Sequence, residues 1–79
     1  MKFELFNAIA HPGSAQVRKW IQQAGILHKL RFRNVVYPEV EADLLARGGS
    51  IERLPALWDG ESLHEGESAV VKFLSNVTR

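Results

Sequence analysis

The residues best suited to chemistry near the start of the chain are His11 and Ser14, in the run His11-Pro12-Gly13-Ser14. A serine hydroxyl becomes a nucleophile when a histidine within hydrogen-bond reach takes its proton and a third group orients that histidine. The sequence offers no identifiable third group for this pair. We therefore predict no catalytic residue here, and no hydrolase.

A second polar pair, Glu67-Ser68, comes directly before an apolar segment of helical period. If Ser14 and Ser68 both stand at helix starts, the unpaired amides there are suited to a carboxylate or phosphate. Pro55 would belong to the same site, with Leu54 contributing its backbone. The alternative is that each serine hydroxyl caps its own helix, as serines at this position commonly do, and we favour this structural role.

Thiol chemistry is excluded because the 79 residues include no cysteine. Without a thiolate there is no disulfide, no thiolate metal site and no thiol-based catalysis. The remaining candidate metal ligands, His11, His28 and His64, have a spacing that fits no compact ligand motif. We therefore predict neither a metal nor another resident cofactor.

Composition narrows the classes of partner. Ten Lys and Arg against nine Asp and Glu give a formal net charge of +1, which argues against a nucleic-acid partner. Apolar runs fall short of the roughly 20 residues that a membrane span needs, and no signal peptide is recognisable, so we expect a cytoplasmic protein without membrane association. Residues 1–79 suffice for one small domain, for which a protein partner or self-association is expected.

Hydrophobic periodicity predicts four strands and three helices. In chain order these are strand 2–6, helix 15–24, strand 30–35, helix 38–47, strands 56–58 and 62–64, and helix 68–77. The first strand is expected near the sheet centre. The first strand, helix and second strand form a right-handed crossover, so these two strands should be parallel.

A hairpin and several boundaries complete the expected fold. Asp59-Gly60 suits a two-residue turn, so the last two strands should be antiparallel. Ser14 is the predicted N-cap of the first helix and Gly25 its stop. The result is an α/β fold of order βαβαββα, a three-layer sandwich in which helices cover both faces of a mixed four-stranded sheet.

The second strand alternates apolar and charged residues. Leu30 and Phe32 lie on one face, and Arg31 and Arg33 on the other, which predicts an edge strand covered on one side only. With Lys29 the two arginines are also a candidate basic stripe for a nucleic acid or an acidic partner. We favour a solvated edge guarded by charge. On the second helix the expected apolar side comprises Val40, Leu44 and Leu45.

This order of elements resembles the thioredoxin-like superfamily, most closely the glutaredoxins and the N-terminal domain of glutathione transferases. Leu54-Pro55, at the entry of the third strand, resembles the cis-proline dipeptide of the family. Glu67-Ser68 is similar to the Glu-Ser motif with which transferases hold the γ-glutamyl end of glutathione. The run from His11 to Ser14 stands where glutaredoxins carry Cys-Pro-Tyr-Cys, and its proline matches the motif proline.

The resemblance implies the fold and a binding groove but not the family's reaction, because disulfide exchange requires a thiolate. The residues implied for a ligand or peptide groove are His11, Pro12, Gly13, Ser14, Leu54, Pro55, Glu67 and Ser68. We expect a redox-inactive binding module that contacts a protein partner or a second copy of itself. The alternative is a glutathione-binding or glutathione-transferase-like protein that uses Ser14 in place of the active-site cysteine.

Overall fold

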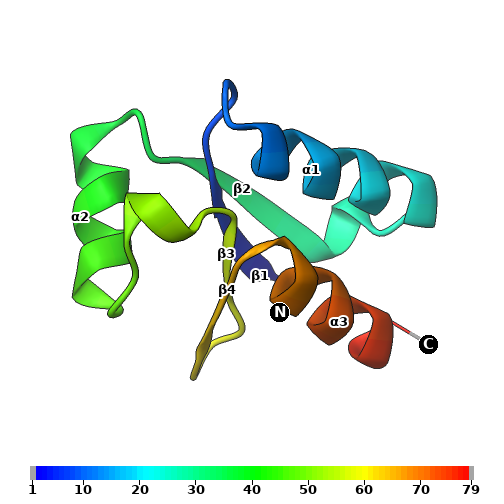
Figure 1. Cartoon of the computed structure of the whole chain (residues 1–79). Coiled ribbons are helices and arrows are strands. Elements are labelled where there is room, and N and C mark those ends of the chain that lie inside the picture. Colours follow the sequence, from blue (N-terminus) through cyan, green and yellow to red (C-terminus); the bar gives the residue numbers. More distant parts are fainter. Residues whose placement is uncertain (1, 79) are drawn as a thin grey trace.

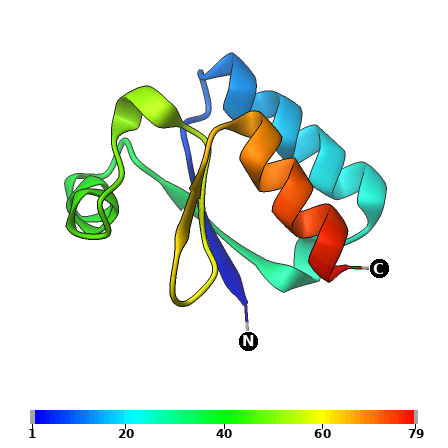
Figure 2. The same cartoon turned by 60° about the horizontal axis from the view of Figure 1, so that its bottom comes forward.

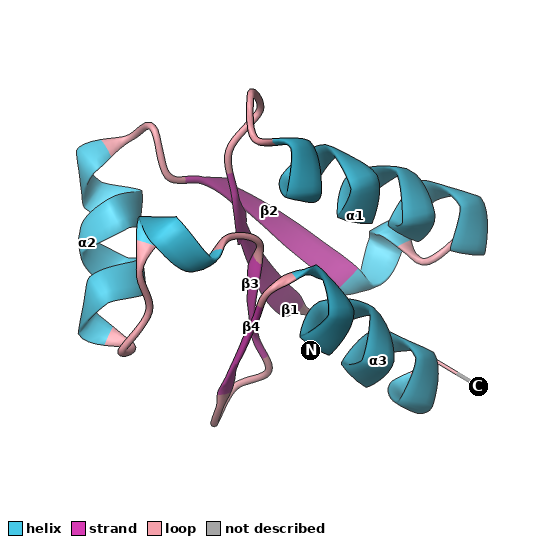
Figure 3. Cartoon of the chain, in the orientation of Figure 1, coloured by secondary structure: helices cyan, strands magenta, loops and turns pink. Residues whose placement is uncertain are grey.

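A mixed sheet of four strands in the order β2-β1-β3-β4 organises the chain (Figure 1). The computed structural model describes residues 2–78. Its elements are β1 (Phe3–Asn7), α1 (Pro12–Ala24), η1 (Leu27–Lys29), β2 (Leu30–Asn34), α2 (Pro38–Ala46), η2 (Ile51–Arg53), β3 (Ala56–Trp58), β4 (Leu63–Glu65) and α3 (Glu67–Val77). The predicted order of strands and helices is confirmed, and only the two short 3-10 turns, η1 and η2, were not predicted (Figure 3).

One of the two inner strands is β1, as predicted from its apolar run. It pairs in parallel with β2 and antiparallel with β3, and β3 pairs antiparallel with β4. One row across the sheet runs from Arg31 through Glu4 to Trp58. The outer strands β2 and β4 are the two edges of the sheet.

Helices cover both faces of the sheet (Figure 2). On one face α1 and α3 lie side by side and enclose a core of Leu5, Val17, Ile21, Ile26, Leu30, Leu57, Val70 and Leu74. On the other face α2 and the segment before β3 enclose a smaller core of Phe6, Val40, Leu44, Leu54 and Ala56. Successive residues of β1 therefore alternate between two cores, since side chains alternate along a strand.

The start of α1 differs from the prediction. The helix begins at Pro12, and its N-cap is His11, whose imidazole Nδ1 accepts from the Ser14 amide at 3.0 Å. Ser14 therefore lies inside the first turn, and its predicted role as N-cap is wrong. The physical reason is Pro12: proline fits the first helical position because no donor is needed there. Gly25 ends the helix as predicted, with φ at 72°.

The hairpin is wider than the predicted two-residue turn. Asp59 to Ser62 form a four-residue link, and β4 covers Leu63–Glu65 rather than 62–64. The Asp59 carboxylate Oδ1 accepts from the amides of Glu61 and Ser62 at 2.8 and 2.7 Å. An aspartate that binds its own following amides makes a side-chain-closed turn, which competes here with the tighter alternative.

The stability of the fold should depend on pH through this turn. The hydrogen bond from His64, together with the two amide hydrogen bonds, lowers the pKa of Asp59 from 3.8 to about 2. A carboxylate whose pKa is lowered by folding stabilises the fold above its unfolded pKa, and that contribution is lost as the pH falls toward 2. We expect the stability advantage of wild type over Asp59→Asn to shrink between pH 4 and pH 2 (both limits follow from this pKa shift).

NMR titration of the Asp59 carboxyl carbon measures this pKa directly. His64→Asn should raise the pKa toward 3.8, with part of the lowering retained through the two amides. A wild-type Asp59 that titrates near 3.8 would contradict the hydrogen-bonded turn.

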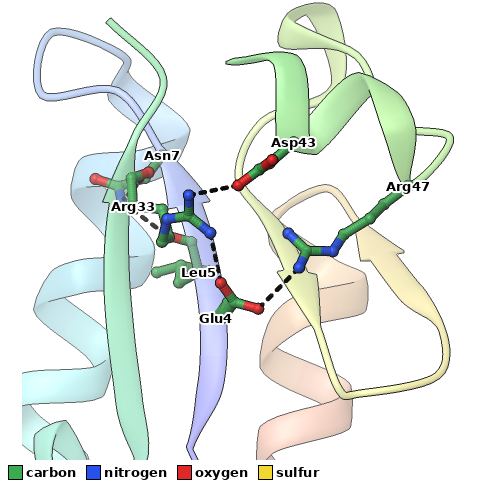
Figure 4. A network of polar contacts seen from close by, with 6 residues as sticks. All are labelled: Glu4, Leu5, Asn7, Arg33, Asp43 and Arg47. Carbon is green, nitrogen blue, oxygen red and sulfur yellow. Dashed lines mark hydrogen bonds and ion pairs between the residues drawn. The ribbon is translucent and has the colours of Figure 1, made fainter. Parts of the chain in front are cut away.

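A polar network joins α2 to the sheet (Figure 4). Arg33 Nη1 lies 2.6 Å from Glu4 Oε1, Arg33 Nη2 lies 2.7 Å from Asp43 Oδ2, and Arg47 Nη2 lies 3.2 Å from Glu4 Oε2. The hydrogen bond from Arg33 lowers the pKa of the Asp43 carboxyl. The prediction that Arg33 lies on an uncovered face is therefore wrong, because α2 covers that end of β2. The apolar side of α2 is also narrower than predicted, since Leu45 is exposed.

Candidate functional site

The residues predicted to form a groove lie where β1 ends and β3 begins. Because β3 runs antiparallel to β1, with Ala56 opposite Phe6, the segment before β3 returns to the end of β1 that leads into α1. The Leu54-Pro55 peptide bond is cis, and the Pro55 carbonyl accepts from the Gly66 amide at 2.8 Å. This bond links the entry of β3 to the start of α3.

His11 and Ser14 form a closed hydrogen-bond unit. The His11 Nδ1 atom lies 3.1 Å from Ser14 Oγ and accepts from the Ser14 amide, so the proton of the neutral ring is on Nε2. Ser14 Oγ also accepts from the Ala8 amide at 3.3 Å. Ser14 is fully buried, so a substrate at the surface does not reach its hydroxyl. The serine-histidine pair is present, but its geometry serves the helix start rather than nucleophilic attack.

Glu67 extends toward the start of α1. A Cβ built on Gly13 would lie 3.0 Å from the His11 ring carbon Cε1 and 3.5 Å from the Glu67 carboxylate Oε1. These distances bring His11, Gly13 and Glu67 together at the surface between the two helix starts. A Cβ at Gly13 would crowd the His11 ring, whereas its distance to Glu67 is ordinary van der Waals contact.

The start of α3 has no side-chain cap. Its N-cap is Gly66, with φ at 96°, and Ser68 is exposed without capping the helix. The prediction that Ser14 and Ser68 each cap their own helix is therefore wrong for both: His11 caps α1, and no side chain caps α3. The first amides of α3 lie at the positive end of the helix dipole with no side-chain acceptor.

The predicted groove residues divide into three groups by exposure. Pro12, Glu67 and Ser68 are exposed, His11 and Gly13 are half-buried, and Ser14, Leu54 and Pro55 are buried. Ser14 and Pro55 are fully buried, and the Ser14 amide and the Pro55 carbonyl are already hydrogen-bonded within the chain. A pocket of about 280 Å³ opens nearby between α1 and α3, and of the eight predicted residues it includes Glu67 alone; its lining is Gln16, Val17, Lys19, Trp20, Gln23, Glu67 and Val71.

Sequence reasoning missed the most exposed apolar side chains of this edge. Ile9 is 74% exposed in the β1–α1 loop, and Val36 and Tyr37 are 71% and 56% exposed in the β2–α2 loop. Both loops leave the sheet at the same level, because Asn7 and Asn34 are partners in the last row of the β1–β2 pair. The available signal was the presence of large apolar residues in segments without periodicity.

Arg18 holds the loop that carries Ile9. Its Nη1 donates to Asn7 Oδ1 at 2.9 Å and to the Ala8 carbonyl at 3.2 Å, and its Nη2 donates to the Ile9 carbonyl at 3.2 Å. Arg18 is half-buried, and its hydrogen bonds tie the backbone of the loop that carries the exposed Ile9 side chain to α1.

Comparisons with family models, with curated proteins and with solved structures gave no significant match. Over residues 2–78, no group of three or more His, Asp and Glu side chains is arranged to hold a metal ion. None of the helices in this range has the length and apolarity needed to cross a bilayer.

Proposed function

We propose that this chain is a redox-inactive, thioredoxin-like binding module. It contacts a protein partner through the end of the sheet at which β1 and β2 lead into the β1–α1 and β2–α2 loops. The order of elements, the mixed sheet and the proline at the entry of β3 support the thioredoxin-like assignment. The absence of cysteine removes thiol chemistry. We therefore propose that the fold serves to bind a partner.

One observation carries the proposal: Ile9, Val36 and Tyr37 are each more than half exposed in the two loops at this end of the sheet. Large exposed apolar side chains on a small domain mark contact sites, because removing their surface from water lowers the free energy. Tyrosine is also enriched among residues that dominate binding energy, since it combines a large apolar ring with a hydroxyl.

Polar groups border this apolar surface. His11, two residues after Ile9, is half-buried, and Glu67 is exposed at the start of α3. A polar rim around an apolar centre is the usual anatomy of a protein interface. A partner is therefore expected to place apolar side chains on Ile9 and Tyr37 and a hydrogen-bonding group beside His11.

The test compares partner recovery by crosslinking and affinity capture for matched variants. Ile9→Ser with Tyr37→Ser should lose the partner recovered by wild type, whereas Leu45→Ser, which removes from α2 an apolar side chain as exposed as Tyr37, should keep it. Equal recovery by all three proteins would remove this edge as the contact surface. Sedimentation over a range of concentrations separates a second copy from another protein as the partner.

A second candidate function is the binding of glutathione at the start of α3. The observation that favours it is the uncapped first turn, whose amides have no side-chain acceptor and are suited to the γ-glutamyl carboxylate. The adjacent Glu67 carboxylate opposes a second negative charge. The buried Ser14 hydroxyl does not reach such a ligand, so this candidate is binding rather than transfer.

Titration of the labelled chain with glutathione tests this candidate. Binding should shift the amide signals of Glu67, Ser68 and Ala69, which lie in the first turn of α3. An unchanged spectrum with glutathione at millimolar concentration would eliminate it. Shifts that appear only at Ile9 or Tyr37 would assign the effect to the apolar surface instead.

A further inference from the structure

The outer edge of β2 pairs with no other strand of residues 2–78. The Val35 amide donates to the Asn7 carbonyl, and the Asn7 side-chain amide donates to the Arg33 carbonyl, so the backbone groups of residues 33 and 35 face β1. Backbone groups alternate in direction along a strand. The N–H and C=O of Phe32 therefore face outward.

Some of the neighbouring outward groups are satisfied locally. The Leu30 amide donates to the Leu27 carbonyl, and the Asn34 carbonyl accepts from the Tyr37 amide at 3.2 Å. The outward groups left over in this part of the chain are the Leu30 carbonyl, both backbone groups of Phe32 and the Asn34 amide. They have the spacing with which a further strand would bind.

One face of this edge carries unbalanced positive charge. Arg31 lies beside Glu4 in the β1–β2 register, but the Glu4 carboxylate is already paired with Arg33 and Arg47. Arg31 is exposed and forms no ion pair with any residue from 2 to 78. Residues 5–38 contain no Asp or Glu at all. Arg31 is therefore the last residue of the row Trp58, Glu4, Arg31. It places a positive charge at the unpaired edge of the sheet.

The opposite face of the same edge is apolar. Phe32 lies beside the buried Leu5 in the register but is itself 39% exposed, and Leu27 just before the strand is 47% exposed. An added strand would thus meet a cation on the α2 face and apolar carbons on the α1 face. Consecutive residues of a strand point to opposite faces, so both requirements fall on neighbouring positions of the partner.

We propose that the free edge of β2 binds an extended segment of a protein partner in which a carboxylate faces Arg31 and the next residue places an apolar side chain on Phe32 and Leu27. Strand addition supplies the backbone hydrogen bonds, and the alternating side chains supply the specificity. A second copy is disfavoured at this edge, because antiparallel pairing of two β2 edges brings two Arg31 charges close together. This surface adjoins the proposed site at Asn34 but uses the side of β2 rather than the loops that follow the strands.

The test uses a blocked heptapeptide, acetyl-Thr-Val-Glu-Val-Glu-Val-Thr-amide, and the same peptide with lysine in place of glutamate. In spectra of the labelled intact chain, the acidic peptide should shift the Phe32 and Asn34 amides and leave those of Leu63 and Glu65, on the other sheet edge, unchanged. Arg31→Glu should weaken acidic-peptide binding by about fivefold and favour the lysine peptide instead. Lys19→Glu makes the same charge change on exposed α1 and should have little effect.

Three results would overturn the proposal. Equal affinity for both peptides would remove the charge requirement, and shifts confined to the β4 edge or to the helix starts would remove the location. Concentration-dependent shifts of the Phe32 amide without peptide would assign the edge to a second copy.

Phe32→Thr keeps the backbone groups and removes the aromatic contact, so it should weaken binding while the spectrum remains that of a folded chain.

Discussion

Replacing Phe6 by alanine is expected to lower the free energy of unfolding by about 3–5 kcal/mol, the usual cost of emptying an aromatic site in a core. Phe6 is fully buried and is the largest side chain of the core beneath α2. The guanidinium carbons of Arg33 and Arg47 lie 5.4 Å from its ring centre, so the ring also supports two charged groups. The other buried residues of this core, Val40, Leu44, Leu54 and Ala56, are all smaller than Phe6.

Urea denaturation monitored by tryptophan fluorescence measures this loss. A domain of this size has a total stability of roughly 4–12 kcal/mol, so Phe6→Ala could leave too little folded protein to fit. Phe6→Leu keeps most of the volume and should lose clearly less. Phe73→Ala is the matched control, since Phe73 is half-buried at the border of the other core and should cost less than Phe6→Ala. Equal losses at Phe6 and Phe73 would contradict the role assigned to the smaller core.

The order of the fold was predictable because it depends on patterns that repeat along the chain. Val17 and Ile21, one helical turn apart, are both fully buried in α1, as their spacing predicts. Gly25 ends that helix because only a residue without Cβ takes a positive φ at no steric cost. Such signals are local, and local sequence is enough to read them.

The helix starts were not predictable to the residue because several polar side chains compete there. Serine is a better N-cap than histidine on average. Pro12, however, occupies the first position of the helix, so the preceding residue, His11, is the N-cap. The result reverses the roles of His11 and Ser14. At the start of α3, the same competition ends with a glycine cap and an exposed Ser68.

The closeness of several predicted groove residues was predictable, but the exposed apolar residues beside them were not. The order of elements brings the loop after β1 and the entry of β3 to one edge, which placed His11, Pro55 and Glu67 in one region. Ile9 and Tyr37 belong to loops, where no periodicity distinguishes an exposed apolar residue from a buried one. Only tertiary packing decides that difference.

The polar network under α2 makes the second strong prediction, which concerns Glu4. Its carboxylate bridges Arg33 and Arg47, and the exposed fractions of the Glu4 and Arg33 side chains are 19% and 14%. Glu4→Gln keeps the shape of the side chain but leaves two enclosed guanidinium groups without their shared anion. We expect a loss of about 2–3 kcal/mol in the free energy of unfolding, somewhat below the cost of breaking a fully buried pair.

Asp43→Asn is the control for that substitution, because it removes an anion from the same network at a position where half of the side chain is exposed. Its effect should be much smaller, since water replaces most of the lost interaction. Added salt should likewise change the Asp43 contribution more than the Glu4 contribution, because enclosed charges are screened less. If the two variants lose the same stability, the network acts as a surface ion pair, and the attachment of α2 depends on its apolar contacts alone.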